Sequence, residues 1–310
     1  MYHYVQAYSN EYPNLKFLNF EDFKRQLSFF EKKFGLITFD DWSRFVSGDS
    51  INLGNKILLT FDDALRCHAK YVVPELLQRG AVGLFFTPTQ PFLDGGTILN
   101  VHKIHLLCGK FPANLLLNCA LDILENREIQ GKSDYDEKTN PYRNQNNETD
   151  LSSFKKLINY VVHPEEQTYF LDLICKKVKF KPNHKDFYLS EDELFEFKQK
   201  NMIIGFHGFS HRLMANLDER SQRDEFEKSE KFISKFTVKN HKCYSHPFGG
   251  FDSFNSKTLN ILEEFGYNYA FNVESSDFYT TTISRERFHI PRYDCNEFPF
   301  GSCHNESIKF

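Results

Sequence analysis

Residues 56–63 read Lys56-Ile57-Leu58-Leu59-Thr60-Phe61-Asp62-Asp63, an apolar run that ends in two adjacent carboxylates. A continuous apolar run of this length is typical of a strand buried on both faces. In parallel α/β folds, ligands and catalytic groups gather where such strands end. Two carboxylates this close repel each other unless a cation or a proton lies between them, so a metal could take one and leave the other as a base. The alternative is that one of them caps the helix that follows.

Strands and helices alternate around this stretch. A helix is predicted from about Leu65 to Arg79, ending at Gly80, and another apolar strand follows it. This rhythm predicts an α/β fold with a parallel sheet or barrel. The predicted strands lie near Val5 and over 56–61, 82–86, 202–206, 243–245 and 269–271, and further helices over 20–34, 221–236 and 256–265.

The rhythm breaks between about 99 and 196, where the sequence reads mostly as helices. They surround a polar loop from Asn126 to Asp150, which we expect to be mobile. We therefore divide the chain into a first barrel part (1–98), a helical insertion (99–196) and a second barrel part (197–310).

Composition excludes several classes of function. The formal net charge of the 310 residues is −4, so no basic excess indicates a nucleic-acid partner. No apolar run approaches the roughly 20 residues that span a bilayer. The first residues lack the features of a signal peptide, and the seven scattered cysteines form no CxxC pair. These observations favour a reducing, cytoplasmic location. The sequence leaves the oligomeric state open.

Two histidines, His207 and His211, follow the predicted strand at 202–206. Histidines four residues apart can face one metal if the segment turns helically. Such pairs are common by chance, so the spacing alone is weak. Together with Asp63, however, they make a set of two histidines and one carboxylate that leaves positions open for water and substrate.

Two further motifs follow later strands. The turn His246-Pro247-Phe248-Gly249-Gly250 could aim backbone N–H groups into a site, as an oxyanion hole requires; an ordinary glycine-rich turn is the alternative. Arg292 follows a short apolar segment and is either a surface charge or a clamp on a carboxylate in the site.

The order and character of these motifs resemble the polysaccharide deacetylases, the NodB-homology enzymes of carbohydrate esterase family 4. The resemblance covers about 1–97 and 200–298. It implies a distorted (β/α) barrel with seven or so strands, here carrying a largely helical insertion. It also implies metal-dependent removal of an acetyl group, usually from an N-acetylated amino sugar. The metal is usually zinc, although related enzymes accept other divalent ions.

The resemblance assigns roles to the motif residues. Asp62 would be the general base, and Asp63 would be a metal ligand beside His207 and His211. The Phe248 backbone N–H would help to form the oxyanion hole. The family usually has glycine after the two aspartates and tyrosine in the third motif, whereas this chain has Ala64 and Phe248.

The start of the chain, Met1-Tyr2-His3, is similar to the biofilm poly-N-acetylglucosamine deacetylases, whose motif order is circularly shifted. That similarity makes His3 the general acid and Arg292 the residue that orients the base. His246 is a second candidate acid. His102 and His105, in the insertion, read as structural histidines.

The expected partner is a carbohydrate: a nucleotide-sugar, a lipid-linked sugar or another glycan precursor, in surface-polysaccharide biosynthesis. Deformylation or O-deacetylation of a sugar would use the same machinery. A catalytically silent glycan-binding barrel is the alternative from another class, against which a base beside a metal set argues. A haloacid-dehalogenase-type phosphatase needs its second aspartate two positions on, where the chain has Ala64 and Leu65.

Overall fold

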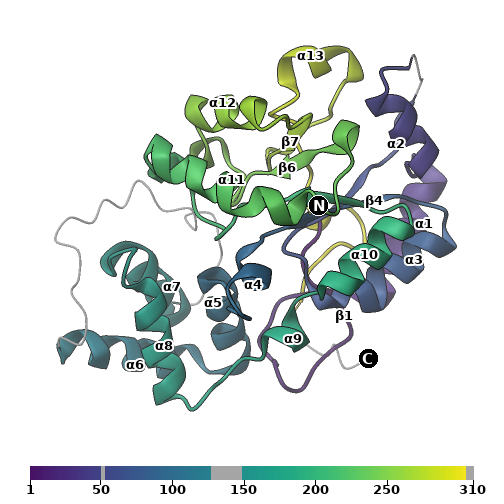
Figure 1. The fold of residues 1–310 in the computed structure, drawn as a ribbon. Coiled ribbons are helices and arrows are strands. Elements are labelled where there is room, and N and C mark those ends of the chain that lie inside the picture. Colours follow the sequence, from purple (N-terminus) through teal and green to yellow (C-terminus); the bar gives the residue numbers. More distant parts are fainter. Residues whose placement is uncertain (50–52, 127–148, 305–310) are drawn as a thin grey trace. The chain divides into compact units, whose positions relative to one another are not determined.

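The structure is a computed structural model that describes residues 1–49, 53–126 and 149–304 (Figure 1). Contacts divide them into two units. The polar loop expected between Asn126 and Asp150 lies almost wholly outside the described residues. The first unit holds residues 1–7, 17–97 and 184–304, and the second holds residues 8–16 and 98–183.

The first unit is built on a parallel sheet of five short strands, which confirms the predicted α/β class. The strands fall where the apolar runs predict them, and all but the last are buried at every residue. In sheet order they are β3 (Leu59–Phe61), β4 (Gly83–Thr87), β5 (Ile203–Phe206), β6 (Cys243–Ser245) and β7 (Tyr269–Phe271).

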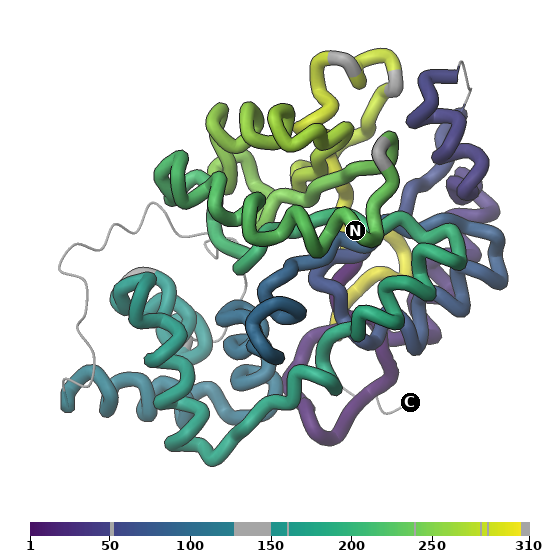
Figure 2. Tube along the Cα trace, in the orientation of Figure 1, coloured from purple at the N-terminus to yellow at the C-terminus, as the bar shows by residue number. Residues whose placement is uncertain are grey.

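Backbone pairing extends this sheet at both edges. Tyr2 pairs in parallel with β3, and Ile290 pairs in parallel with β7. Met1 then donates a hydrogen bond from its amino group to the carbonyl oxygen of Tyr293 at 2.6 Å, so the two extended edges meet (Figure 2). The sheet therefore curves into the distorted barrel that the family resemblance implied. A small parallel pair, β1 (Val5–Gln6) with β2 (Leu18–Asn19), continues the first edge.

The longer helices of this unit begin at side chains that accept a hydrogen bond from a backbone N–H of the first turn. These capping residues are Asn19 for α1 (Phe20–Lys33), Thr38 for α2 (Phe39–Val46), Ser190 for α10 (Glu191–Gln199), Asp218 for α11 (Glu219–Ile233) and Asn255 for α12 (Ser256–Glu264). Shorter elements are α4 (Gln90–Leu93), α9 (His184–Phe187), η4 (Met214–Asn216), η5 (Lys239–His241), η6 (Phe251–Ser253), η7 (Thr280–Thr282), α13 (Ile283–Glu286) and η8 (Cys295–Glu297).

The helix predicted from about Leu65 to Arg79 is confirmed, and it begins at Arg66, directly after a sharp turn. Asp63 and Ala64 adopt positive φ angles of 79° and 50°, and Leu65 then pairs with Tyr188 in an isolated antiparallel bridge. After this turn the chain is helical from Arg66 onward, through the π-helical turn η1 (His68–Val72) and α3 (Val73–Gln78). The chain therefore bends sharply where the two carboxylates lie.

The second unit is helical, with a hydrophobic core of its own. It ends at Asn183 rather than at the expected 196, because α10 packs on the sheet: the Phe197 ring lies 4.8 Å from that of Phe85 on β4. Residues 8–16 join it, and Asn14 donates from its N–H to the carbonyl oxygen of Gly109 at 2.8 Å. Its helices are α5 (Asn100–Lys110), α6 (Ala113–Glu125), α7 (Thr149–Lys156), η3 (Leu157–Val161) and α8 (Gln167–Lys177). Among all the described helices, none combines the length and apolarity needed to cross a membrane.

Candidate active site

Three polar side chains from the ends of two strands that flank β4 converge at one point. Asp63 follows β3, and His207 and His211 follow β5. The Asp63 Oδ1 atom lies 3.7 Å from His207 Nε2 and 3.6 Å from His211 Nε2, and the three side chains are at most 8% exposed. These separations are long for hydrogen bonds, but metal bonds of about 2.0–2.1 Å at tetrahedral angles would hold such atoms about 3.4 Å apart. The three residues therefore fit a divalent ion such as zinc.

The ring of His207 is oriented as a metal ligand requires. Its Nδ1 atom lies 2.8 Å from the carbonyl oxygen of Ser245, which only accepts, so Nδ1 carries the hydrogen. The lone pair is then on Nε2, which faces Asp63. Burial lowers the pKa of His207 and so favours the neutral ring. Ligating histidines usually have a second hydrogen bond of this kind.

The segment that carries both histidines is not helical, contrary to the condition that the sequence suggested. It is a tight turn in which Gly208 has a φ of 78° and His211 a φ of 55°. Glycine adopts such angles freely, whereas a residue with a Cβ atom does so at a cost of about 1–2 kcal/mol. The two rings nevertheless meet, with their centroids 4.8 Å apart.

Asp62 is held by Arg292, which the sequence left open as a surface charge or a clamp. Two guanidinium N–H groups donate to its carboxylate oxygens, at 2.8 and 2.9 Å, and both residues are buried. Burial alone would raise the pKa of Asp62, but the Arg292 charge outweighs it and holds that pKa well below its usual range. Arg292 is fixed in turn by the carbonyl oxygen of Asn272 and by Ser245 Oγ.

His3 emerges beside Asp62 because the chain before it pairs with β3. The Asp62 N–H donates to the Tyr2 carbonyl oxygen at 3.0 Å, and the charge of His3 contributes to lowering the pKa of Asp62. The carbonyl oxygen of His3 accepts from His68 Nε2 at 2.8 Å. Burial lowers the pKa of His68 to about 4. The sequence gave no reason to single out His68, because a histidine in a helix that packs on a sheet reads as core.

Of the remaining candidate residues, Phe248 lies beside the metal set, whereas the other histidines have different surroundings. Phe248 has a φ of 65°, and its ring lies 5.1 Å from that of His211, so its turn borders the metal set. His246 is stacked on Phe254, its Nε2 lies 3.1 Å from the Phe288 carbonyl oxygen, and burial lowers its pKa to about 3. Such a ring is neutral at pH 7, which argues against it as the acid. His102 and His105 belong to the second unit.

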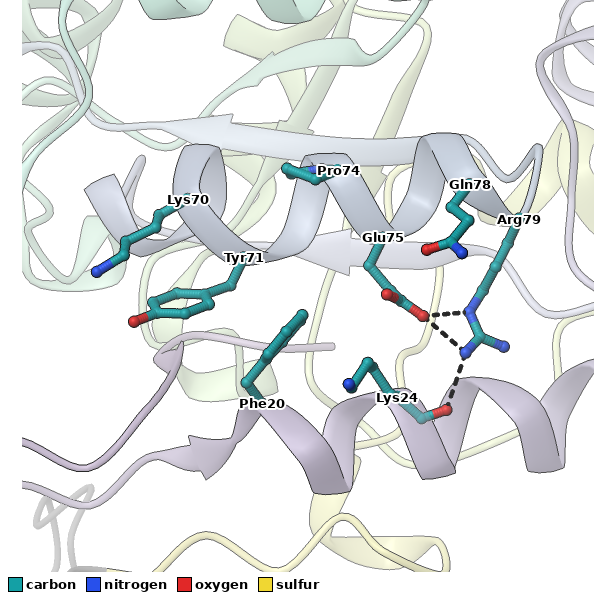
Figure 3. Close-up of a pocket in the computed structure, with 8 residues that line it drawn as sticks. All are labelled: Phe20, Lys24, Lys70, Tyr71, Pro74, Glu75, Gln78 and Arg79. Atoms are coloured by element: carbon teal, nitrogen blue, oxygen red, sulfur yellow. Dashed lines mark hydrogen bonds and ion pairs between the residues drawn. The ribbon is translucent and has the colours of Figure 1, made fainter.

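A cavity of about 520 Å³ lies elsewhere in the first unit, and it contains none of these residues (Figure 3). Phe20 and Lys24 of α1 face Tyr71, Glu75 and Arg79 across it. Its main polar contact is internal, because Arg79 Nε donates to Glu75 Oε1 at 2.7 Å. The candidate site residues therefore lie at the strand ends and not in this cavity.

One segment of the chain matches a known protein family. Residues 165–270 match the family model for polysaccharide deacetylase. The predicted resemblance to the polysaccharide deacetylases is therefore confirmed over this segment. The matched segment contains both site histidines and Phe248, while Asp62 and Asp63 lie before it. No curated protein sequence matches the chain.

Solved deacetylases share the fold. The Streptococcus pyogenes deacetylase PplD, in complex with acetate, is 13% identical with a TM-score of 0.54, over 94% of this chain and 89% of that one. IcaB from Ammonifex degensii is 12% identical with a TM-score of 0.52, over 94% and 88%. A de-N-acetylase from Aggregatibacter actinomycetemcomitans is 12% identical with a TM-score of 0.52, over 94% and 92%. These structures show the shared fold, and the family match supports a hydrolase that acts on amide bonds.

Replacing Arg292 by methionine should leave the Asp62 carboxylate buried without its cation. We expect the free energy of unfolding of the metal-free protein at pH 7 to fall by about 3–5 kcal/mol, measured by urea denaturation. The native pKa of Asp62 is depressed, so the wild-type contribution is complete above the unfolded pKa of about 3.9 and disappears as the pH falls through the native value. The Arg292→Met protein should not show this loss of stability at acid pH. Adding Asp62→Asn to the Arg292→Met protein should restore part of its stability. Equal unfolding free energies at pH 7 would contradict the assignment.

Proposed function

We propose that this protein is a metal-dependent deacetylase that hydrolyses an N-acetyl group on an amino sugar or glycan precursor. One observation carries the proposal: the buried Asp62, oriented by Arg292, adjoins the set of Asp63, His207 and His211 in sequence and space. Amide hydrolysis by water needs a base separate from the metal ligands but close to them. The deacetylase family match supports the same reaction.

Asp63, His207 and His211 would hold the ion, and two nitrogen donors with one oxygen donor suit zinc. When bound, such an ion polarises a carbonyl oxygen and lowers the pKa of water. A set of only three protein ligands is typical of catalytic zinc sites, because it leaves a position for water or substrate.

The chain's own groups would divide the proton transfers. Asp62 accepts the proton of the attacking water while Arg292 holds both of its oxygens in place. The Phe248 backbone N–H donates a hydrogen bond to the acetyl oxygen as negative charge develops there. His3 donates a proton to the leaving nitrogen. A carboxylate whose pKa is depressed is too weak to deprotonate ordinary water, so this base depends on the ion that the adjacent residues would hold.

The substrate and the setting belong to the same proposal. We propose a nucleotide-sugar, a lipid-linked sugar or another glycan precursor as substrate, and surface-polysaccharide biosynthesis in the cytoplasm as the setting. The acetate bound to the similarly folded deacetylase PplD is the product that such a reaction would release.

Metal content tests the ligand set. Purified protein loaded with zinc and then dialysed should hold about one ion per chain by elemental analysis. Asp63→Ala and His207→Ala should lose it, since each removes one of three ligands, whereas His105→Ala in the second unit should retain it. Retention by His207→Ala, or absence of metal from the wild type, would contradict the site.

Replacing Asp62 by asparagine tests the base. The side chain keeps its shape but is a far weaker proton acceptor, so kcat for acetate release from N-acetylated sugars should fall about 10²–10⁴-fold. The zinc content should stay at the wild-type level, because Asp63 is the ligand. Unchanged kcat would refute the role of Asp62. If the metal-loaded wild type released no acetate but bound glycans, the silent-barrel alternative would hold instead.

Replacing His3 by glutamine tests the acid. An amine must be protonated as it leaves, whereas a phenolate leaves unaided, so the variant should lose about 10²-fold or more in kcat on an N-acetyl sugar but much less on an aryl acetate. The comparison of the two substrates on one preparation is the measurement. An equal loss on both would show that His3 does not act on the leaving group.

A further inference from the structure

A buried glutamate on α11 holds the turn that carries both histidines. The Glu225 carboxylate accepts the Ser210 N–H at Oε2, at 2.8 Å, and the Ser210 hydroxyl at Oε1, at 2.6 Å. Glu225 is 5% exposed, and Ser210 directly precedes His211. Both oxygens of one carboxylate are thus used on a single residue of the turn.

The opposite side of the turn is held by the segment after β4. Thr89 donates from its N–H to the Gly208 carbonyl oxygen at 3.1 Å, and Gln90 donates to that of Phe209 at 2.9 Å. Ser229 links the two supports: its hydroxyl lies 2.6 Å from Thr89 Oγ1 and donates to the backbone carbonyl oxygen of α11 one turn earlier at 2.7 Å. The turn is therefore fixed through both its N–H and its C=O groups.

The turn at 207–211 contains backbone strain, which these hydrogen bonds must offset. His211 has a φ of 55°, which costs about 1–2 kcal/mol for a residue with a Cβ atom. Gly208 has a φ of 78°, and a Cβ atom there would lie 3.6 Å from Glu225 Oε2 and 3.3 Å from Pro247 Cγ. The hydrogen bonds to Glu225, Thr89 and Gln90 offset this cost in the conformation that places both histidines beside Asp63.

We propose that Glu225 is a positioning residue for the metal site. It fixes the turn at 207–211 so that both histidine Nε2 atoms face Asp63 Oδ1 before an ion arrives. The inference rests on the proposed function in presuming that an ion binds there. Glu225 acts only through Ser210, and outer partners of this kind are typically worth 10–100-fold in metal affinity.

The test is a metal titration of Glu225→Gln. Glutamine keeps the shape but places an NH₂ group where an acceptor is needed, so one of the two Ser210 donors loses its partner. We expect the Co²⁺ and Zn²⁺ dissociation constants of the metal-free protein to rise about 10–100-fold, with a changed visible spectrum of the Co²⁺ form. The control is Glu227→Gln, an exposed glutamate two residues along the same helix, which should match the wild type.

A second pair of variants keeps the proposal falsifiable if Glu225→Gln folds poorly. Ser210→Ala removes only the hydroxyl donor and should weaken metal binding, while Ser210→Thr retains a hydroxyl and should recover most of it. In the double variant Glu225→Gln/Ser210→Ala, the loss of metal affinity should be smaller than the sum of the two single losses, because both substitutions disrupt the same contact. Wild-type affinity and spectrum in Ser210→Ala and in folded Glu225→Gln would overturn the inference.

The same titration separates this inference from the proposed function. A wild type that binds the ion tightly but hydrolyses no acetyl group would remove the proposed function, and the variants would still decide the role of Glu225. A wild type that binds no divalent ion would overturn both.

Discussion

The bidentate pair of Arg292 and Asp62 is the contact on which the site and the closure of the sheet both depend. It joins the segment beyond β7 to the end of β3, across 230 residues of sequence. A buried ion pair gives little net stability, because desolvation of two charges offsets their attraction. The ion pair instead fixes the position of Asp62, because the guanidinium binds both carboxylate oxygens and so holds the side chain in one orientation beside Asp63. The edges that meet at Met1 and Tyr293 therefore bring Asp62 and Arg292 together.

Parallel strand order explains how such distant residues share one edge. Asp62 directly follows β3 and His207 directly follows β5, and both strands pair with β4 between them. The second unit separates β4 from β5 along the chain without disturbing their pairing, since each doubling of a loop adds only about 0.6 kcal/mol to its closure. The edge that carries the candidate site is set by short buried strands, and the long connection is free to carry helices of its own.

The sequence predicted the strands and the Asp63, His207 and His211 set because apolar runs and motif spacing are local signals. It could not predict features that depend on which polar side chain faces inward. In a helix as charged as α11, Glu225 reads as one more solvent-exposed acid. The extension of the sheet unit through α10 was missed for a related reason: helices of the two units have the same amphipathic pattern, and only packing shows which core they join.

Backbone strain bears on whether the site is functional or decayed. Seven non-glycine residues in the described chain have positive φ, and four of them lie in the three motifs: Asp63, Ala64, His211 and Phe248. Strained residues persist where the surrounding structure imposes them, and they cluster at active sites. Ala64 and Phe248 are the two departures from the family pattern, yet both keep a backbone that glycine would adopt at less cost. Alanine and phenylalanine therefore fit the backbone of the candidate site, and the two departures are compatible with the function that we propose.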